Sequence, residues 1–318
     1  MKISTLAALL LFATMHVDAA DKYPVKPIRF VVPYAPGGGS DITARALAQK
    51  LGDSLEQSFV VDSRPGASGL IGTELVAKSP ADGYTILLAD SAHTINEVIY
   101  KSPRYRAIAD FAPITLVATT PLALMAHPSF QPSLRDLITM PKAQTEKIAL
   151  GTSGQAGAPH LTYLLMRAKT GLMLNEITYK GGGPAMNDAI AGQIQMVFTS
   201  LAAGVPHMKA GRLRALGVSS GKRHPAMPDI PTFQEAGLKD VAVLLWYGVL
   251  APNGTPKEIV DLLNREIGKA LQAQDMRERF AAQAIDISGA GPDEFRTFLQ
   301  RELSTWRDVV KRSNEPLQ

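Results

Sequence analysis

Apolar runs rich in β-branched residues alternate with helical patterns along almost the whole chain. The first run, Ile28–Pro33, leads through a Gly-rich turn into a helical pattern over Asp41–Leu51, and a last helical pattern covers Pro292–Lys311. Strands that alternate with helices favour a mainly parallel sheet with helices on both faces. A chain of 318 residues with 46% apolar content is also long enough for two hydrophobic cores. The sequence therefore predicts an α/β fold in two lobes.

The same patterns place the individual elements. We expect strands at Ile28–Pro33, Phe59–Val61, Tyr84–Ala89, Ile114–Val117, Ala123–Ala126, Lys147–Leu150, Glu176–Tyr179, Met196–Phe198, Leu213–Val218 and Leu244–Leu250. We expect helices at Asp41–Leu51, Ile71–Lys78, Pro159–Thr170, Gly183–Ala191, Pro256–Gln272, Met276–Gln283 and Pro292–Lys311.

The N-terminus resembles a secretory signal peptide over residues 1–19. Lys2 gives a positive start, residues 6–13 form an apolar stretch, and Val17-Asp18-Ala19 suits cleavage after its last residue. The alternatives are a membrane anchor, for which the apolar stretch is too short, and a buried N-terminal helix. No later stretch reaches the roughly 20 uncharged apolar residues of a spanning helix. We therefore expect an exported chain that is soluble once the signal is removed.

The composition excludes several function classes. The chain has no Cys, so disulfides, thiolate metal sites and a lipid anchor on an N-terminal cysteine are impossible. Its six His residues are isolated, and no pair stands at i, i+4 with an acidic neighbour, so no metal and no cofactor is implied. The formal net charge is +4, but the basic residues are scattered and aromatic residues make up only 6%. We therefore expect no nucleic-acid partner.

Glycines and small polar residues follow many of the expected strands. Gly37 to Gly39 let the backbone approach a ligand closely, and the free N–H groups of the following helix favour a negative charge there. In an open α/β sheet, ligands bind outside the carboxyl ends of the strands, where such loops lie. The sequence therefore predicts an anion site in a cleft between the lobes. The other loops of this kind are Gly151–His160, Asp90–Thr94, Tyr179–Pro184 and Thr199-Ser200.

Two enzymatic alternatives share parts of this pattern. Dinucleotide binding is suggested by Asp62, which ends the second strand about 20 residues after the glycines, but the G-x-G-x-x-G spacing fails because its third glycine position is Ile42. A serine hydrolase is suggested by Ser153 with His160, but Gly-Thr-Ser-Gly-Gln lacks the second glycine of the nucleophile elbow. Both alternatives explain the loops less well than a binding protein does.

Short motifs occur in a fixed order along nearly the whole mature chain. They are Tyr23-Pro24, Pro27-Ile28, Pro36-Gly37-Gly38-Gly39-Ser40-Asp41, Arg64-Pro65-Gly66-Ala67-Ser68-Gly69, Ala81-Asp82-Gly83-Tyr84-Thr85, His93-Thr94-Ile95-Asn96, Tyr179-Lys180-Gly181-Gly182-Gly183-Pro184-Ala185, Gly211-Arg212-Leu213-Arg214-Ala215-Leu216, Pro228-Asp229-Ile230-Pro231-Thr232, Glu235-Ala236-Gly237, Trp246-Tyr247-Gly248 and Ala251-Pro252. Each motif is weak alone, but the ordered set is specific. In it the chain resembles the substrate-binding proteins of tripartite tricarboxylate transporters, the TctC or Bug type.

This resemblance implies a type II-like periplasmic binding protein with a ligand cleft between its lobes and no catalytic residue. Such proteins hand small carboxylates to membrane permease subunits, and we expect this one to be a monomer. A ligand sensor for a signalling partner is the alternative use of the same fold. The implied lobes are 21–122 with 247–318, and 123–246, with chain crossings near Thr120 and Trp246 that would form the hinge.

The resemblance also implies how the ligand is held. Backbone N–H groups of Gly38 and Gly39 would bind a carboxylate beside Asp41, which caps its helix. Residues of the second lobe would hold the same carboxylate from the opposite side, and others would meet the distal part of the ligand. The expected ligand-binding residues are Tyr34, Gly38, Gly39, Asp41, Ser91, His93, Thr152, Ser153, Gly157, Ala158, His160, Thr199 and Ser200.

Two positions depart from the family pattern. The segment Thr199-Ser200-Leu201 is neutral where an acidic or amide residue is frequent, and Glu97 stands where Pro is frequent. The first departure removes a partner for a ligand amine, which favours a simple acid over an amino acid as the ligand.

Overall fold

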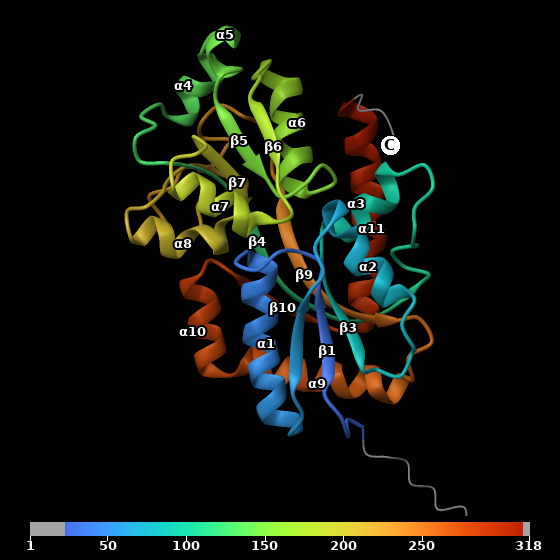
Figure 1. Cartoon of the computed structure of the whole chain (residues 1–318). Helices are drawn as coiled ribbons and strands as arrows, with labels where there is room; N and C mark the ends of the chain where they lie inside the picture. Colours follow the sequence, from blue (N-terminus) through green and yellow to red (C-terminus); the bar gives the residue numbers. More distant parts are fainter. Residues whose placement is uncertain (1–22, 314–318) are drawn as a thin grey trace, which may run out of the picture.

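The computed structural model describes residues 23–313 (Figure 1). The predicted signal peptide over residues 1–19 lies outside this part. The strands are β1 (Ile28–Val32), β2 (Phe59–Ser63), β3 (Thr85–Asp90), β4 (Phe111–Ala126), β5 (Ala149–Thr152), β6 (Asn175–Thr178), β7 (Met196–Ser200), β8 (Arg214–Val218), β9 (Leu244–Pro252) and β10 (Asp286–Ala290). They form one sheet in the order β2-β1-β3-β9-β4-β7-β5-β6, with β8 and β10 each paired to β4.

Helices cover the sheet along its whole width (Figure 1). They are α1 (Gly39–Leu55), α2 (Leu70–Ala77), α3 (Ala92–Ile99), α4 (Leu134–Thr139), α5 (Lys142–Thr145), α6 (Ala158–Thr170), α7 (Gly182–Ile190), α8 (Leu201–Lys209), α9 (Lys257–Gln272), α10 (Gln274–Ala282) and α11 (Pro292–Ser313), with a 3-10 turn at Ala67–Gly69. Among the described residues, none of these helices is long and apolar enough to cross a membrane.

The sheet is parallel towards its two ends and antiparallel in the middle. Strands β2, β1 and β3 run parallel at one end, and β6, β5 and β7 run parallel at the other. The long strands β4 and β9 run antiparallel to each other and to β7 and β3 respectively. Figure 1 shows these two strands running between the upper and lower halves of the molecule. The expected α/β architecture is confirmed, and the two connecting strands account for its antiparallel part.

Strand β4 replaces two separate strands that the sequence suggested, Ile114–Val117 and Ala123–Ala126. Its residues 111–121 pair with β9, and its residues 122–126 pair with β7. Pro121 lies at the change of partner, where a missing N–H donor is tolerated. The next N–H group, of Leu122, donates to Ser219 Oγ at 2.9 Å. The expectation of two strands was wrong because one strand continues through both halves of the sheet.

Alternate residues of the strands point into different cores, as the two-residue period of a strand requires. In one half of the sheet, Phe30 joins one apolar cluster while Val31 joins the cluster on the opposite face. In the other half, Leu124 and Met125 are divided in the same way. Each half of the sheet is therefore buried between two helical layers.

Five elements were not expected from the sequence: α3, α4, α5, α8 and β10. Helix α8 was hidden by Gly204 and Pro206, which both disfavour helix interiors. The structure explains the glycine, because an added Cβ there would overlap the sulfur of Met125. The lobe boundaries at 122/123 and 246/247 stay a prediction, although the pairing partners of β4 change between Pro121 and Leu122, one residue before the first of them.

Candidate functional site

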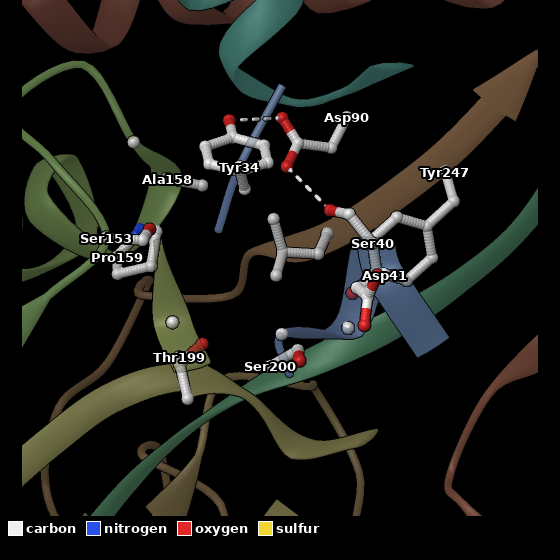
Figure 2. A pocket seen from close by; sticks show the side chains of 15 residues that line it. Tyr34, Ser40, Asp41, Asp90, Ser153, Ala158, Pro159, Thr199, Ser200 and Tyr247 are labelled. Carbon is white, nitrogen blue, oxygen red and sulfur yellow. Dashed lines mark hydrogen bonds between the residues drawn. The ribbon is translucent and has the colours of Figure 1, made fainter. Parts of the chain in front are cut away.

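A cavity lies where the carboxyl ends of strands from both halves of the sheet meet (Figure 2). The space between its lining residues is about 450 Å³ when the part open to solvent is included. Its lining residues follow or end β1, β3, β5, β6 and β7, or belong to β9. They are Tyr34, Gly38, Gly39, Ser40, Asp41, Asp90, Ser153, Gly157, Ala158, Pro159, Gly182, Thr199, Ser200, Leu245 and Tyr247.

Four helices begin at this cavity. Helices α1, α6, α7 and α8 follow the N-cap residues Gly38, Gly157, Gly181 and Ser200. The first N–H groups of a helix have no partner within the helix, and they carry the positive end of its dipole. Because four such ends face one cavity, the helix dipoles favour an anion there.

Glycine is required where α1 begins. An added Cβ at Gly39 would overlap the hydroxyl oxygen of Tyr247 and come within 2.5 Å of Ser200 Oγ. Tyr247 belongs to β9 and Ser200 to the start of α8, so three separate segments pack together at Gly39. The position of Gly39 therefore depends on tertiary contacts as well as on the local turn.

No lysine or arginine is among the residues that line this cavity in the described chain. Its charged lining residues are Asp41 and Asp90. Asp41 is held by two local contacts, because the N–H of Gly37 donates to its Oδ2 at 3.1 Å and Arg45 Nε donates to its Oδ1 at 2.9 Å. Asp41 therefore fixes the glycine turn and has its charge partly balanced from outside the cavity.

Asp90 is buried and surrounded by neutral donors (Figure 2). Its Oδ1 accepts from the hydroxyl of Tyr34 at 2.9 Å and from the N–H of Ala92 at 3.0 Å, and its Oδ2 accepts from Ser40 Oγ at 3.3 Å. Burial raises the pKa of Asp90 to about 6, against the opposing effect of these three hydrogen bonds. The cavity therefore contains a carboxyl group that titrates close to neutral pH.

The two halves of the molecule touch beside the cavity. The N–H of Ala35, after β1, donates to the carbonyl of Lys180, after β6, at 3.0 Å. Ser68, before α2, accepts at its Oγ from the N–H of Ala156, before α6, at 3.0 Å. These contacts join the loops that carry the helix N-termini, so the structure has the two sides of the cavity in contact.

Nine of the thirteen sequence-predicted ligand residues line this cavity. They are Tyr34, Gly38, Gly39, Asp41, Ser153, Gly157, Ala158, Thr199 and Ser200. Figure 2 shows them arriving from both halves, with Ser153, Ala158 and Thr199 opposite Tyr34 and Asp41. Their role as ligand contacts stays a prediction, because the structure shows placement and not binding.

The structure places the other four predicted residues outside the cavity lining. Ser91 and Thr152 are fully buried. His93 lies in α3 instead of a polar loop, with its Nε2 2.8 Å from the carbonyl of Ala107, and burial lowers its pKa to about 4. His160 Nδ1 lies 2.8 Å from both carboxylate oxygens of Glu176. Thr152 Oγ1 donates to Glu176 Oε1 at 2.7 Å, so Thr152, His93 and His160 have partners within the protein. The buried hydroxyl of Ser91 has no hydrogen-bond partner among the described residues.

The features that suggested enzymes also have structural partners. Asp62 accepts from Arg29 Nε at 2.6 Å and from Arg64 Nε at 2.9 Å, so its carboxylate is engaged at the sheet edge. His160 is engaged by Glu176, although Ser153 faces the cavity. No cluster of three or more potential metal ligands occurs within residues 23–313.

Sequence reasoning missed six lining residues: Ser40, Asp90, Pro159, Gly182, Leu245 and Tyr247. Asp90 carried the clearest signal, as an acidic residue that directly ends an apolar strand. Tyr247 is opposite Asp90 in the β3–β9 pair, a relation that depends on strand order. Only the sheet topology could therefore bring β9 to the site.

Comparison with known proteins agrees with this geometry. The sequence profile of the family described as "Tripartite tricarboxylate transporter family receptor" matches residues 43–314. Protein BugT of Bordetella pertussis is 38% identical over 302 residues, which cover 94% of this chain and 93% of that protein. The likeness thus extends over nearly the full length of both chains.

Solved structures show the same fold. The periplasmic binding protein BugD has a TM-score of 0.90 at 33% identity, over 93% of this chain and 100% of that one. Rpa4515 of R. palustris, solved with adipate, has a TM-score of 0.87 at 32% identity, over 92% of this chain and 98% of that one. MatC (Rpa3494) of Rhodopseudomonas palustris, solved with bound malate, has a TM-score of 0.86 at 28% identity, over 91% of this chain and 100% of that one. This chain belongs to the tripartite tricarboxylate transporter receptor family, the TctC or Bug-type periplasmic solute-binding proteins.

Proposed function

We propose that this protein captures a small carboxylate in the periplasm and delivers it to a tripartite tricarboxylate-type membrane permease, without catalysis. The observation that carries the proposal is the convergence of four helix N-termini on one cavity whose lining has no lysine or arginine. Backbone N–H groups aimed at one point bind an anion with defined geometry. A carboxylate is the anion that the family relationship favours.

The ligand class we favour is a small dicarboxylate. Two structural neighbours were solved with adipate and with malate, which are both dicarboxylates. In this chain, Gly38 and Gly39 would hold one carboxylate from the first half, and Ser153, Gly157 and Ala158 would hold it from the second. Thr199 and Ser200 would meet the distal part. These two residues are neutral, but Asp90 lines the same cavity, so the lining does not by itself favour a simple acid over an amino acid.

Capture would involve closure of the two halves on the ligand. The contacts between Ala35 and Lys180 and between Ser68 and Ala156 support this mechanism, because they join loops from opposite halves. A hinge near Thr120 and Trp246 would let the halves part. The closed form would then dock on the permease, with the protein acting as a monomer.

Thermal unfolding of the mature protein against a panel of acids tests the capture step. The panel holds mono-, di- and tricarboxylates, aromatic acids, amino acids and NAD. A ligand at about 100 times its Kd adds about 2.7 kcal/mol to the unfolding free energy, which raises the midpoint by several degrees. We expect a rise with one class of carboxylate and none with NAD. The proposal would be contradicted if NAD alone raised the midpoint, or if none of the acids raised it.

Delivery needs a separate measurement. Cells that lack this chain should lose uptake of the acid identified in the panel, and the restored wild-type gene should recover it. Uptake that continues unchanged without this chain, although the purified protein binds the acid, would limit the function to capture.

A further inference from the structure

Asp90 is a carboxyl group enclosed beside a site built for anions. Its side chain lines the cavity and is only 8% exposed. An anion held by the first N–H groups of α1 would face Asp90 across Ser40, because Ser40 lies in the first turn of that helix and donates to Asp90 Oδ2. An anion in the cavity and an ionised, buried Asp90 repel each other, and the repulsion favours protonation of one of them.

No cation is among the groups that hold Asp90 in the described chain. Its hydrogen-bond donors are the hydroxyls of Tyr34 and Ser40 and the N–H of Ala92. The ionisable groups that interact with it are Tyr34, Tyr105 and Tyr247, and burial raises the pKa of each, so all three are neutral near pH 7. The other acid of the lining, Asp41, is paired with Arg45.

The two oxygens of Asp90 are used unequally. Oδ1 already accepts two hydrogen bonds, from Tyr34 at 2.9 Å and Ala92 at 3.0 Å. Oδ2 accepts one, from Ser40 Oγ at 3.3 Å. A proton added to Asp90 is therefore best placed on Oδ2, where it can donate back to Ser40 Oγ. The Ser40 hydroxyl hydrogen is then free to turn towards the cavity.

We infer that Asp90 takes up one proton from solvent when a carboxylate occupies the cavity, and that Ser40 then donates its hydroxyl hydrogen to that carboxylate. This inference rests on the proposed function, because it concerns the same ligand. No covalent bond of the ligand changes, and the proton taken up offsets part of the negative charge of the incoming anion. Through Asp90, the site thus binds a carboxylate and a proton together.

The pH dependence follows from this linkage. In the protein without ligand, the pKa of Asp90 is about 6. Binding of the anion raises this pKa, so the affinity for the anion increases as the pH falls from about 8 towards 6. A rise of about one pKa unit gives an uptake of about 0.4 proton at pH 7 and about threefold tighter binding at pH 6.5 than at pH 8. Both carboxyls of adipate and of malate are largely ionised in this range, so their own titration contributes little.

Calorimetric titration with adipate and with malate tests the inference at pH 7 in buffers of different ionisation enthalpy. If neither binds, the acid with the largest effect in the thermal panel replaces them. The slope of observed enthalpy against buffer ionisation enthalpy gives the number of protons taken up. We expect a positive slope for the wild-type protein. An acid that binds with a slope of zero would overturn this inference alone, whereas failure of every acid to bind would overturn the proposed function as well.

The Asp90→Asn variant identifies the group. Its amide can still accept from Tyr34 and can donate to Ser40 Oγ, as protonated Asp90 would. We expect no proton uptake, equal affinity at pH 6.5 and pH 8, and binding at pH 8 at least as tight as wild type. Asp53→Asn, an exposed change on α1, should keep the wild-type slope. Uptake that persists in Asp90→Asn would assign the proton to another group and refute the inference.

Discussion

The two glycine loops that face each other across the cavity have the same backbone geometry but different supports. Gly38, before α1, has φ −85° and ψ 173°, and Gly157, before α6, has φ −84° and ψ 150°. The first loop is fixed within its own half by Asp41, through Gly37 N–H. The second loop has a local turn bond from the N–H of Gly157 to the carbonyl of Gly154 at 3.1 Å, and it is also held from the opposite half, where Ser68 Oγ accepts from the N–H of Ala156.

This difference separates a preformed side of the site from one completed by closure. The contact of Asp41 with Gly37 needs only four residues of chain, so it can form whether or not the halves meet. The contact of Ser68 with Ala156 spans 88 residues and joins the two halves. Changes in the first loop should therefore alter ligand contact itself, and changes at Ser68 should alter the closing equilibrium.

The largest effect should come from Gly183→Ala, which tests whether the halves must meet. An added Cβ at Gly183 would overlap the backbone carbonyl oxygen of Pro36, and neither backbone can move aside without parting the halves. We expect affinity for the bound acid to fall by at least about 100-fold, roughly 3 kcal/mol. The thermal midpoint without ligand should change little, because the halves can separate. Calorimetry and thermal unfolding measure the two quantities.

Gly221→Ala is the matched control for that variant, because nothing lies within 4 Å of an added Cβ there. It should bind like wild type. If Gly183→Ala also keeps its affinity, the contact between the halves in this structure is not required for binding.

The next effect should come from Asp41→Ala, which removes the internal support of the first loop. Hydrogen bonds to a charged group contribute about 1.5–3 kcal/mol, so affinity should fall by about tenfold or more. Asp53→Ala on the exposed face of the same helix should leave affinity unchanged. The expectation that Asp41 caps its helix was wrong, because the N-cap of α1 is Gly38 and Asp41 accepts from the preceding Gly37 N–H. A change at Asp41 that lowers only the thermal midpoint would show that it stabilises the start of α1 without supporting ligand contact.

A smaller effect should come from Ser68→Ala, which removes the support of the second loop. The loss of one neutral hydrogen bond costs about 1 kcal/mol, so affinity should fall by about fivefold, mainly through faster dissociation. Ser79→Ala is the control, because it loses a side-chain hydrogen bond within one half of the molecule, from Ser79 Oγ to the carbonyl of Leu75. Stopped-flow fluorescence can follow dissociation through Trp246, which lies in β9. Slower association with unchanged dissociation would argue against a role in closure.

The smallest effect should come from Arg45→Gln, which separates the two partners of Asp41. The side chain of Arg45 is 53% exposed, and exposed ion pairs contribute about 0–1 kcal/mol. We expect less than threefold loss of affinity in calorimetry. A loss as large as that of Asp41→Ala would show that the ion pair, and not the bond to Gly37, supports the loop.

The features that could be predicted from the residue pattern are those that depend on neighbours along the chain. The alternation of apolar runs and helical patterns gave the α/β class, and the glycine loops before α1 and α6 gave most of the site. Both follow from local rules, because strand and helix periods and glycine turns act over a few residues. For this reason Gly38, Gly39, Gly157 and Ala158 could be expected at the cavity before the fold was known.

The set of segments that share the site depends instead on how distant parts of the chain pack together. Tyr247 reaches the cavity because β9 pairs with β3, and the single strand β4 continues past Pro121 because its partners change there. His93 stood in a polar run of sequence, yet Tyr105 and Phe111 pack against its ring in the core. Contacts of this kind depend on strand order and on packing between distant segments, which the local pattern of residues does not encode.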